Sequence, residues 1–474
     1  MLARKIALNT IISSVARVLG TFISLATIGF ITRYLDRAGW GEYSIISVFG
    51  GIFAVLADLG LYQVLVREIS REGADENRII NNIFSLRLFG GLLIFAFAPL
   101  ASLLFPYSSQ LRWGILIGMI GFWLLNDIQV LVGVFQKRLR IDKIAIGELL
   151  GKLVQLGFIY LFIVLKFDFL WIAATISFGA FANFAFVLFS VKKIMPIKLE
   201  FDWPFWLEIW RKSYFLAISN ILVTIYFSAN ALIISIFHPP DDVGIFRLSY
   251  KVLESLIFFP AMFAGLAMPL LSRAAHNDWP NFKKIFQIAN NVLIITGIPL
   301  VLGGIVLSPR IIELLGGPNF PESMPVLAIL MIAVGFIFFG TLFSYVLIAL
   351  DKSRSLMIIS SIGVILNLVL NFLFIPRYSY DGAAAITVLT EGLVTMLMAV
   401  SIFKIIGYLP SFKAGVKVLF ASLIMAAAIW EFREQNVLIL LIGGSLIYFC
   451  LLFLLKGIST REIKEILAPK EAQN

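Results

Sequence analysis

Long apolar runs separated by short polar connectors make up most of the chain. The runs lie at about 6–33, 41–66, 80–104, 112–135, 144–165, 168–190, 212–236, 243–270, 284–308, 325–349, 355–375, 382–405, 414–431 and 437–456. Most are close to the roughly 20 residues that an α-helix needs to cross a bilayer. The pattern therefore predicts an all-α polytopic membrane protein with about fourteen transmembrane helices.

Two similar polar breaks interrupt the apolar pattern. The first is DRAGWGEYS (36–44), and the second is DDVGIFRLS (241–249), so that Gly41 aligns with Gly244. Further matches follow in the same order, which indicates a duplication. Because each copy begins on the same side of the membrane and contains an even number of spans, we predict two six-helix lobes in parallel repeat, followed by two C-terminal helices.

The longest polar break places the boundary between these lobes. It contains Trp203, Trp206 and Trp210 beside lysines and arginines, a composition typical of a segment at the membrane surface. We therefore predict an N-lobe at 1–190, a cytoplasmic interfacial linker at 191–211, a C-lobe at 212–405, and two extra helices with a cytoplasmic tail at 406–474.

Composition and charge agree with a membrane location. The 474 residues are 60% hydrophobic and only 14% charged, with a mean hydropathy of +0.97, which excludes an ordinary soluble domain. The net charge of +10 does not indicate nucleic-acid binding, because most lysines and arginines lie in alternate short connectors and at the two termini. This asymmetry predicts cytoplasmic termini in a cytoplasmic (plasma) membrane, with basic loops that contact anionic membrane lipids.

Enzyme and metal chemistry find little support in the sequence. Cys450 is the single cysteine, and His238 and His276 are the two histidines, so we expect neither a disulfide framework nor a metal site. Nucleotide loops, dinucleotide fingerprints, zinc-protease motifs and nucleophile elbows are missing from the sequence, so we expect no cofactor. The outer connectors are too short to form a catalytic domain, so function must reside within the membrane.

Several cations inside the predicted spans are candidates for binding an anionic substrate. Arg247 and Lys251 share one helix face with Glu254, at spacings i, i+4 and i+7. A lone cation near the bilayer centre costs at least ~2.5 kcal/mol, so such side chains should face protein or water. Arg17 has no acidic residue within a helical turn, which favours anion binding or gating, and Lys152 completes the candidate set.

Three of these four cations also have a structural alternative. Lys152 can pair with Glu148 one turn earlier, and Lys251 can be neutralised by Glu254, which would leave Arg247 to extend toward the outer surface. Arg87 lies close enough to the cytoplasmic end of its span to reach the aqueous phase in the same way.

Acidic and amide side chains supply the remaining candidates. We expect coupling or gating roles for Glu254, Asp58 and Glu391. Asn230, Asn367 and Asn371 suit either contacts with sugar hydroxyls or hydrogen bonds between helices.

Three stretches resemble one family of membrane transporters. Residues 39–71 (GWGEYSIISVFGGIFAVLADLGLYQVLVREISR) contain a Gly-x-Tyr-Ser entry, an Asp-Leu-Gly and closing arginines. Residues 225–252 contain a Tyr-Lys pair, and residues 366–391 (LNLVLNFLFIPRYSYDGAAAITVLTE) contain paired asparagines, Ile-Pro-Arg and Gly-Ala-Ala before a Thr and a Glu. These features are similar to those of the polysaccharide transporter family, the O-antigen flippase type, in the multidrug/oligosaccharidyl-lipid/polysaccharide (MOP) exporter superfamily.

The resemblance implies a MATE-like bundle that acts as a flippase for surface polysaccharide biosynthesis. The implied substrate is a sugar or oligosaccharide linked to polyprenyl or dolichyl phosphate or pyrophosphate, moved by alternating access between the lobes. It implies a secondary transporter coupled to an ion gradient, with H⁺ or Na⁺ as candidate ions, or to the membrane potential. We expect a monomer. Asn230 stands where many relatives carry an aspartate, and an amide cannot hold a proton in that role.

Two other functions compete with this interpretation. One is an ion-coupled multidrug or metabolite exporter of the MATE type, which a cavity lined mainly by acids would favour. The other is a membrane glycan polymerase or ligase. Such enzymes usually carry a sizeable outer loop, and this sequence has none.

Overall fold

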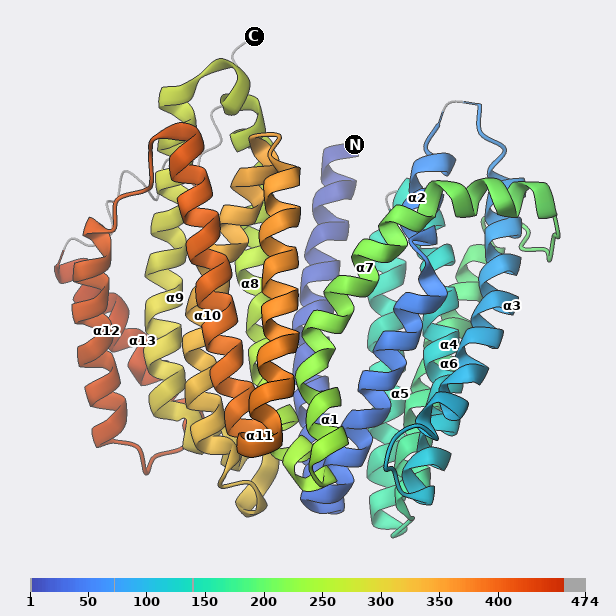
Figure 1. Cartoon of the computed structure of the whole chain (residues 1–474), viewed down its shortest axis with the longest axis horizontal. Helices are drawn as coiled ribbons and strands as arrows, with labels where there is room; N and C mark the ends of the chain where they lie inside the picture. The colour runs from blue at the N-terminus through green and yellow to red at the C-terminus, as the bar shows by residue number, and fades with distance from the viewer. Residues whose placement is uncertain (1, 72, 139, 456–474) are drawn as a thin grey trace. The chain divides into compact units, whose positions relative to one another are not determined.

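The computed structural model describes the backbone of residues 2–71, 73–138 and 140–455, and this part of the chain is entirely helical outside its connectors (Figure 1). Its elements are α1 (Leu2–Asp58), α2 (Leu61–Ile69), α3 (Glu76–Ser102), α4 (Ser109–Lys137), α5 (Ile141–Val164), α6 (Phe169–Lys192), α7 (Trp203–Phe237), α8 (Pro240–Asn277), α9 (Trp279–Gly316), the short 3₁₀ helix η1 (Gly317–Asn319), α10 (Ser323–Ala349), α11 (Ser353–Ile406), α12 (Lys413–Glu431) and α13 (Val437–Leu454). The predicted all-α fold class is confirmed.

Two predicted connectors are kinks inside long helices. α1 changes direction at Asp36 (φ 56°, ψ −165°), and α11 does so at Ser379 (φ 43°, ψ −128°). One residue with positive φ is enough to break the helical hydrogen-bond ladder and turn the chain back. The run predicted at 41–66 also ends early, because Leu59 and Gly60 take positive φ and separate α1 from α2.

The helices have the length and surface of a multi-pass membrane protein, as predicted. Among the described residues, ten helices are long and apolar enough to cross a membrane, and two of these are the kinked α1 and α11. Large apolar side chains such as Phe22, Leu93, Phe181 and Leu373 lie exposed on the outside of the helices. In a soluble protein so many exposed apolar side chains would cause aggregation, whereas in a bilayer they face the lipid.

The chain folds into two compact units. Unit 1 comprises Met1–Arg247 and Leu315–Asn319, and unit 2 comprises Leu248–Leu314 and Phe320–Asn474. Each unit has its own apolar core among the described residues. Val64, Leu131 and Phe135 belong to the core of unit 1, and Val418 and Leu440 to that of unit 2. The lobe boundaries derived from the sequence stay a prediction.

A short segment before α7, residues 198–202, is fastened to α3 by side chains. Asn81 Oδ1 accepts from the amide of residue 198 at 3.1 Å, Asn82 Oδ1 accepts from that of Asp202 at 2.8 Å, and Ser85 Oγ accepts from that of residue 200 at 2.9 Å. These bonds satisfy backbone groups that no strand or helix pairs. We call residues 198–202 the strap.

Asp202 connects the strap to the start of α7. Its carboxylate accepts from Arg78 Nη2 at 2.6 Å and from the backbone amide of Phe205 at 3.2 Å. The bond from Arg78, followed by that from Phe205, holds the pKa of Asp202 below its ordinary value. Beyond this N-cap, the first turns of α7 run across the ends of α2 and α3 in Figure 1 before the helix turns to follow the others.

The two glycines of the repeated polar breaks meet within unit 1. A Cβ added at Gly41 would lie 1.8 Å from the carbonyl oxygen of Pro240 and 3.1 Å from the amide nitrogen of Gly244. A Cβ at Gly244 would lie 2.4 Å from the carbonyl oxygen of Arg37. Small residues let helix backbones approach this closely, so α1 and α8 cross where neither carries a side chain.

This crossing predicts that Gly41→Ala destabilises the protein, by about 1–3 kcal/mol for an overpacked contact. The matched control is Gly51→Ala on the same helix, where an added Cβ meets nothing within 4 Å. Thermal unfolding of the purified protein in detergent measures both variants. A Gly41→Ala melting temperature at or above that of the wild type would contradict the close crossing.

Candidate functional site

The structure brings two of the predicted substrate cations together in unit 1. Lys152 on α5 donates from Nζ to the carbonyl oxygen of Gly20 on α1 at 3.1 Å. Gly20 leaves room for this ammonium group, since an added Cβ would lie 3.2 Å from Nζ. Arg17 precedes Gly20 by one helical turn and its side chain is exposed, whereas Lys152 is half-buried. One cation from α1 and one from α5 therefore lie beside the same turn of α1.

The charged face predicted on α8 is present. Lys251 Nζ and Glu254 Oε2 form an ion pair at 2.7 Å, and both side chains are about one-third exposed. This pair is the structural alternative that the sequence left open for Lys251, and it reduces the charge available to a substrate. Arg247, one turn earlier on the same helix, is buried. This burial does not support the alternative in which Arg247 extends toward the outer surface.

A buried charge network occupies the interior of unit 1. Arg87 on α3 pairs through Nη2 with Asp58 at 2.9 Å and donates to Asn126 Oδ1 at 2.5 Å. The adjacent Asp127 is also buried and interacts electrostatically with Arg87. The Arg87 side chain is 0% exposed, so the expectation that it would reach the aqueous phase is wrong. It lies opposite acids on α1 and α4, which hold it inside.

The candidate asparagines of α11 bind each other and the second arm of their helix. Asn371 Nδ2 donates to Asn367 Oδ1 at 2.8 Å, and Asn367 Nδ2 donates to Thr390 Oγ1 at 3.3 Å. Only the bond from Asn367 to Thr390 crosses the kink at Ser379, so Asn367 joins the two arms of α11, while Asn371 binds Asn367 within the first arm. Glu391 is half-buried on the second arm. Asn230 is buried on α7 in unit 1.

Sequence reasoning missed two polar partners. Asn126 binds Arg87, and Gln155 Nε2 donates to Tyr43 Oη at 2.9 Å between α5 and α1. Both residues are uncharged polar side chains inside apolar runs, and that was the available signal. A residue type alone does not reveal which helix lies opposite it.

The described residues contain no group of three or more His, Cys, Asp or Glu side chains that could hold a metal ion. Arg17, Lys152 and Arg247 are cations of unit 1 that can bind an anionic group. Lys251 is a cation of unit 2 and is paired with Glu254.

Comparison with protein families gives two matches. A family model described as "Polysaccharide biosynthesis protein" matches residues 6–275, which is more than half of the chain. A second model, MatE, matches the shorter range 216–373. The sequence resemblance to polysaccharide transporters of this superfamily is confirmed.

Similar proteins and structures extend over nearly the whole chain. A Haloferax volcanii protein named "Probable low-salt glycan biosynthesis flippase Agl15" is 23% identical over 471 residues, covering 96% of this chain and 97% of its own length. The structure of the lipid II flippase MurJ in an inward closed conformation has a TM-score of 0.75 at 16% identity, covering 96% of this chain and 99% of that one.

A multidrug transporter of the MATE family, in an inward-facing conformation, also has the same fold. Its TM-score is 0.65 at 12% identity, over 82% of this chain and 94% of its own. These structures establish the fold, and the predicted MATE-like architecture is confirmed.

The buried network makes a stability prediction. Arg87→Met leaves Asp58 and Asp127 without their buried countercharge and should cost about 3–5 kcal/mol. Removing one acid as well, in Arg87→Met/Asp58→Asn, should restore part of the loss. Thermal unfolding measures both, with Arg67→Met on α2 as the exposed control. A double variant no more stable than the single one would contradict the network.

Proposed function

We propose that this chain, which belongs to the polysaccharide biosynthesis protein family, is a flippase for a sugar or oligosaccharide linked to polyprenyl or dolichyl phosphate. It would move this substrate across the cytoplasmic membrane for the synthesis of surface polysaccharide. The full-length similarity to a protein named as a glycan biosynthesis flippase supports the proposal. The observation that carries it is that Lys152 on α5 binds the carbonyl oxygen of Gly20 on α1, one helical turn after Arg17, within a bundle of apolar helices.

The phosphate of such a substrate is the group that hydrocarbon rejects most strongly. An anion crosses a membrane only if the protein replaces its water with cations and hydrogen-bond donors. Guanidinium and ammonium groups bind phosphate through charge-assisted hydrogen bonds, which are roughly twice as strong as neutral ones. Arg17 and Arg247 are the guanidinium groups of the proposed site, with Lys152 and Lys251 as the ammonium groups.

Transport would proceed by alternating access between the lobes at 1–190 and 212–405. The sugar and phosphate would pass between the lobes while the hydrocarbon tail stays in the bilayer. Both termini would lie in the cytoplasm, since the basic connectors belong on that side. We expect the protein to work as a monomer.

The driving force would act through acids that change protonation or ion contacts. Glu254, Asp58 and Glu391 are the candidates, with H⁺ or Na⁺ as the coupling ion. Asp58 and Glu254 each pair with a cation, so protonation of either acid would free that cation. Asn230, Asn367 and Asn371 would contact sugar hydroxyls only if their present hydrogen bonds exchange.

The relatives named above are flippases and transporters, so the prediction that the chain is a transporter and no enzyme is confirmed at the level of its family. Export of drugs or metabolites remains the second candidate. The MatE model over 216–373 and the MATE-like fold support it. The polysaccharide model covers more of the chain, 6–275, and this difference favours the flippase.

Reconstitution tests the proposal. Proteoliposomes containing a radiolabelled lipid-linked sugar should transfer it between leaflets faster than protein-free vesicles do. Arg17→Ala or Arg247→Ala should slow transfer roughly tenfold or more, since a charge-assisted hydrogen bond contributes about 1.5–3 kcal/mol. Arg67→Ala, which removes an exposed arginine on α2, serves as the control.

Two results are informative in different ways. Wild-type transfer no faster than that of empty vesicles, across several lipid-linked donors, would overturn the flippase proposal. Wild-type transfer with unaffected Arg17→Ala and Arg247→Ala variants would overturn the site assignment alone.

A further inference from the structure

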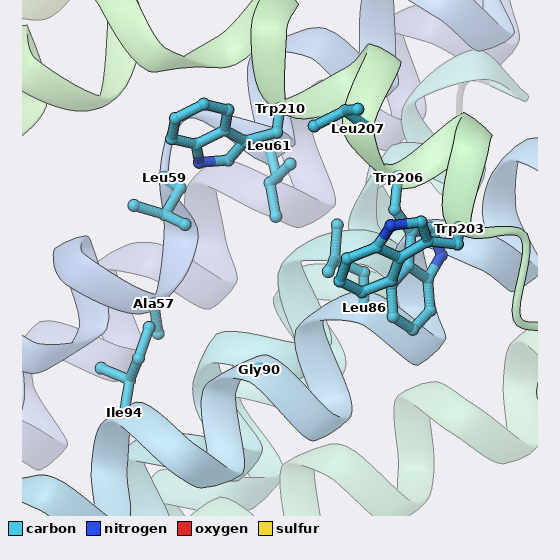
Figure 2. A pocket seen from close by; sticks show the side chains of 10 residues that line it. All are labelled: Ala57, Leu59, Leu61, Leu86, Gly90, Ile94, Trp203, Trp206, Leu207 and Trp210. Atoms are coloured by element: carbon cyan, nitrogen blue, oxygen red, sulfur yellow. The ribbon is translucent and has the colours of Figure 1, made fainter.

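An apolar cavity of about 270 Å³ opens beneath the first turns of α7 in unit 1 (Figure 2). Its walls include three tryptophans of α7, Trp203, Trp206 and Trp210, together with Leu86, Gly90 and Ile94 of α3. Figure 2 shows the indole rings of α7 above the ribbon of α3, with Gly90 between them and Ile94. None of the residues that line the cavity is one of the cations proposed to bind the transported phosphate.

The sequence spacing explains why the space exists. Leu86, Gly90 and Ile94 recur every four residues and so share one face of α3. Gly90 supplies no side chain at the centre of that face, and an added Cβ there would meet nothing within 4 Å. The strap holds the start of α7 across this face, so the gap left by Gly90 stays open beneath the tryptophans.

One polar group in the wall has no partner. The indole nitrogen Nε1 of Trp206 is buried and makes no hydrogen bond with any described residue. An indole N–H can only donate, and a buried donor without an acceptor destabilises the protein. A molecule that fills the cavity and brings an acceptor to Trp206 would remove this destabilisation.

A depression beside the cavity carries two basic side chains and one acidic side chain. Leu207 lies both in the cavity wall and in a neighbouring depression lined by Glu208, Arg211 and Lys212. Lys212 pairs with Glu208 at 2.6 Å and with Glu68 at 3.4 Å. Arg211 is exposed, and no acid in the described part of the chain lies within salt-bridge distance of it. The guanidinium of Arg211 is therefore available for an anion next to the apolar cavity.

We propose that this cavity binds one acyl chain of an anionic phospholipid, with the lipid phosphate on Arg211. A phospholipid matches all three features: its chain fills an apolar space, its ester carbonyls accept hydrogen bonds, and its phosphate binds a guanidinium. The exposed tryptophans and the direction of the first turns of α7 fit a helix at the membrane surface. Assignment to the cytoplasmic leaflet rests on the proposed topology.

Such a lipid would fix the start of α7 to α3. The strap already joins these helices through side-chain hydrogen bonds, and the acyl chain would fill the remaining gap. Membrane composition would then control how firmly the beginning of α7 is held.

Photo-cross-linking tests the proposal on the full-length protein. Proteoliposomes are prepared with a phosphatidylglycerol that carries a diazirine in its acyl chain, and cross-linked peptides are mapped by mass spectrometry. Cross-links should concentrate on residues 86–94 and 203–210. An even distribution over all lipid-facing helices would overturn the site, and this readout needs no variant and no transport activity.

Two variants separate the chain from the headgroup. Gly90→Leu fills the cavity and should lower cross-linking at these two segments roughly tenfold, whereas Gly157→Leu, at an exposed open position on α5, should leave it unchanged. Arg211→Gln should remove the preference for phosphatidylglycerol over phosphatidylcholine, whereas Arg354→Gln on α11 should keep it. Unchanged cross-linking in a folded Gly90→Leu protein would contradict the proposal.

A competition experiment tests the kind of lipid. Unlabelled phosphatidylglycerol should displace the probe better than a polyprenyl phosphate at the same concentration. Stronger displacement by the polyprenyl phosphate would assign the cavity to the transported substrate and overturn a phospholipid site. Because this measurement records binding alone, its failure leaves the flippase proposal standing.

Discussion

The low polarity of the bilayer interior is the constraint on which the rest of this structure depends. Backbone N–H and C=O groups that cannot reach water must form hydrogen bonds with each other. Each described segment that is long enough to span the bilayer is therefore a helix. Charges in these helices need partners inside the protein for the same reason. Arg87 meets this need through Asp58 and Asn126, and Lys251 meets it through Glu254. When these charges are paired inside the protein the fold is stable, and other cations can then bind a substrate.

This distinction separates structural from functional polar groups. Arg87 is fully buried among acids, so its charge is consumed in holding α3 against α1 and α4. Asn367 similarly joins the two arms of α11 through Thr390, and Asn371 binds Asn367 on the first arm. Arg17 differs, because its side chain is exposed while Lys152 binds the adjacent turn of α1. Of the cations of the proposed site, Arg17 is therefore the one whose side chain is exposed, whereas Arg247 is buried.

The sequence predicted most of the helices and the positions of two breaks, but not that these breaks are kinks within continuous helices, nor most of the side-chain pairs. The runs 112–135 and 325–349 became α4 and α10, since their length and apolarity decide the outcome without help from other residues. Asp36 and Ser379 lie in predicted connectors, but the single residue with positive φ that makes each connector a kink is a backbone angle that composition does not encode. Local spacing revealed the pair of Lys251 with Glu254. The partners of Arg87 are remote in sequence and could not be found in this way.

The central claim is that cations within the spans recognise the phosphate of a lipid-linked sugar. The most direct measurement compares leaflet transfer of two glycolipids with the same sugar and hydrocarbon chain, one joined through phosphate and one through an uncharged ether. The account predicts that the protein accelerates transfer of the phosphate-linked molecule and leaves the uncharged one at the rate of protein-free vesicles. Equal acceleration of both would show that the phosphate is not the recognised group and would contradict the account.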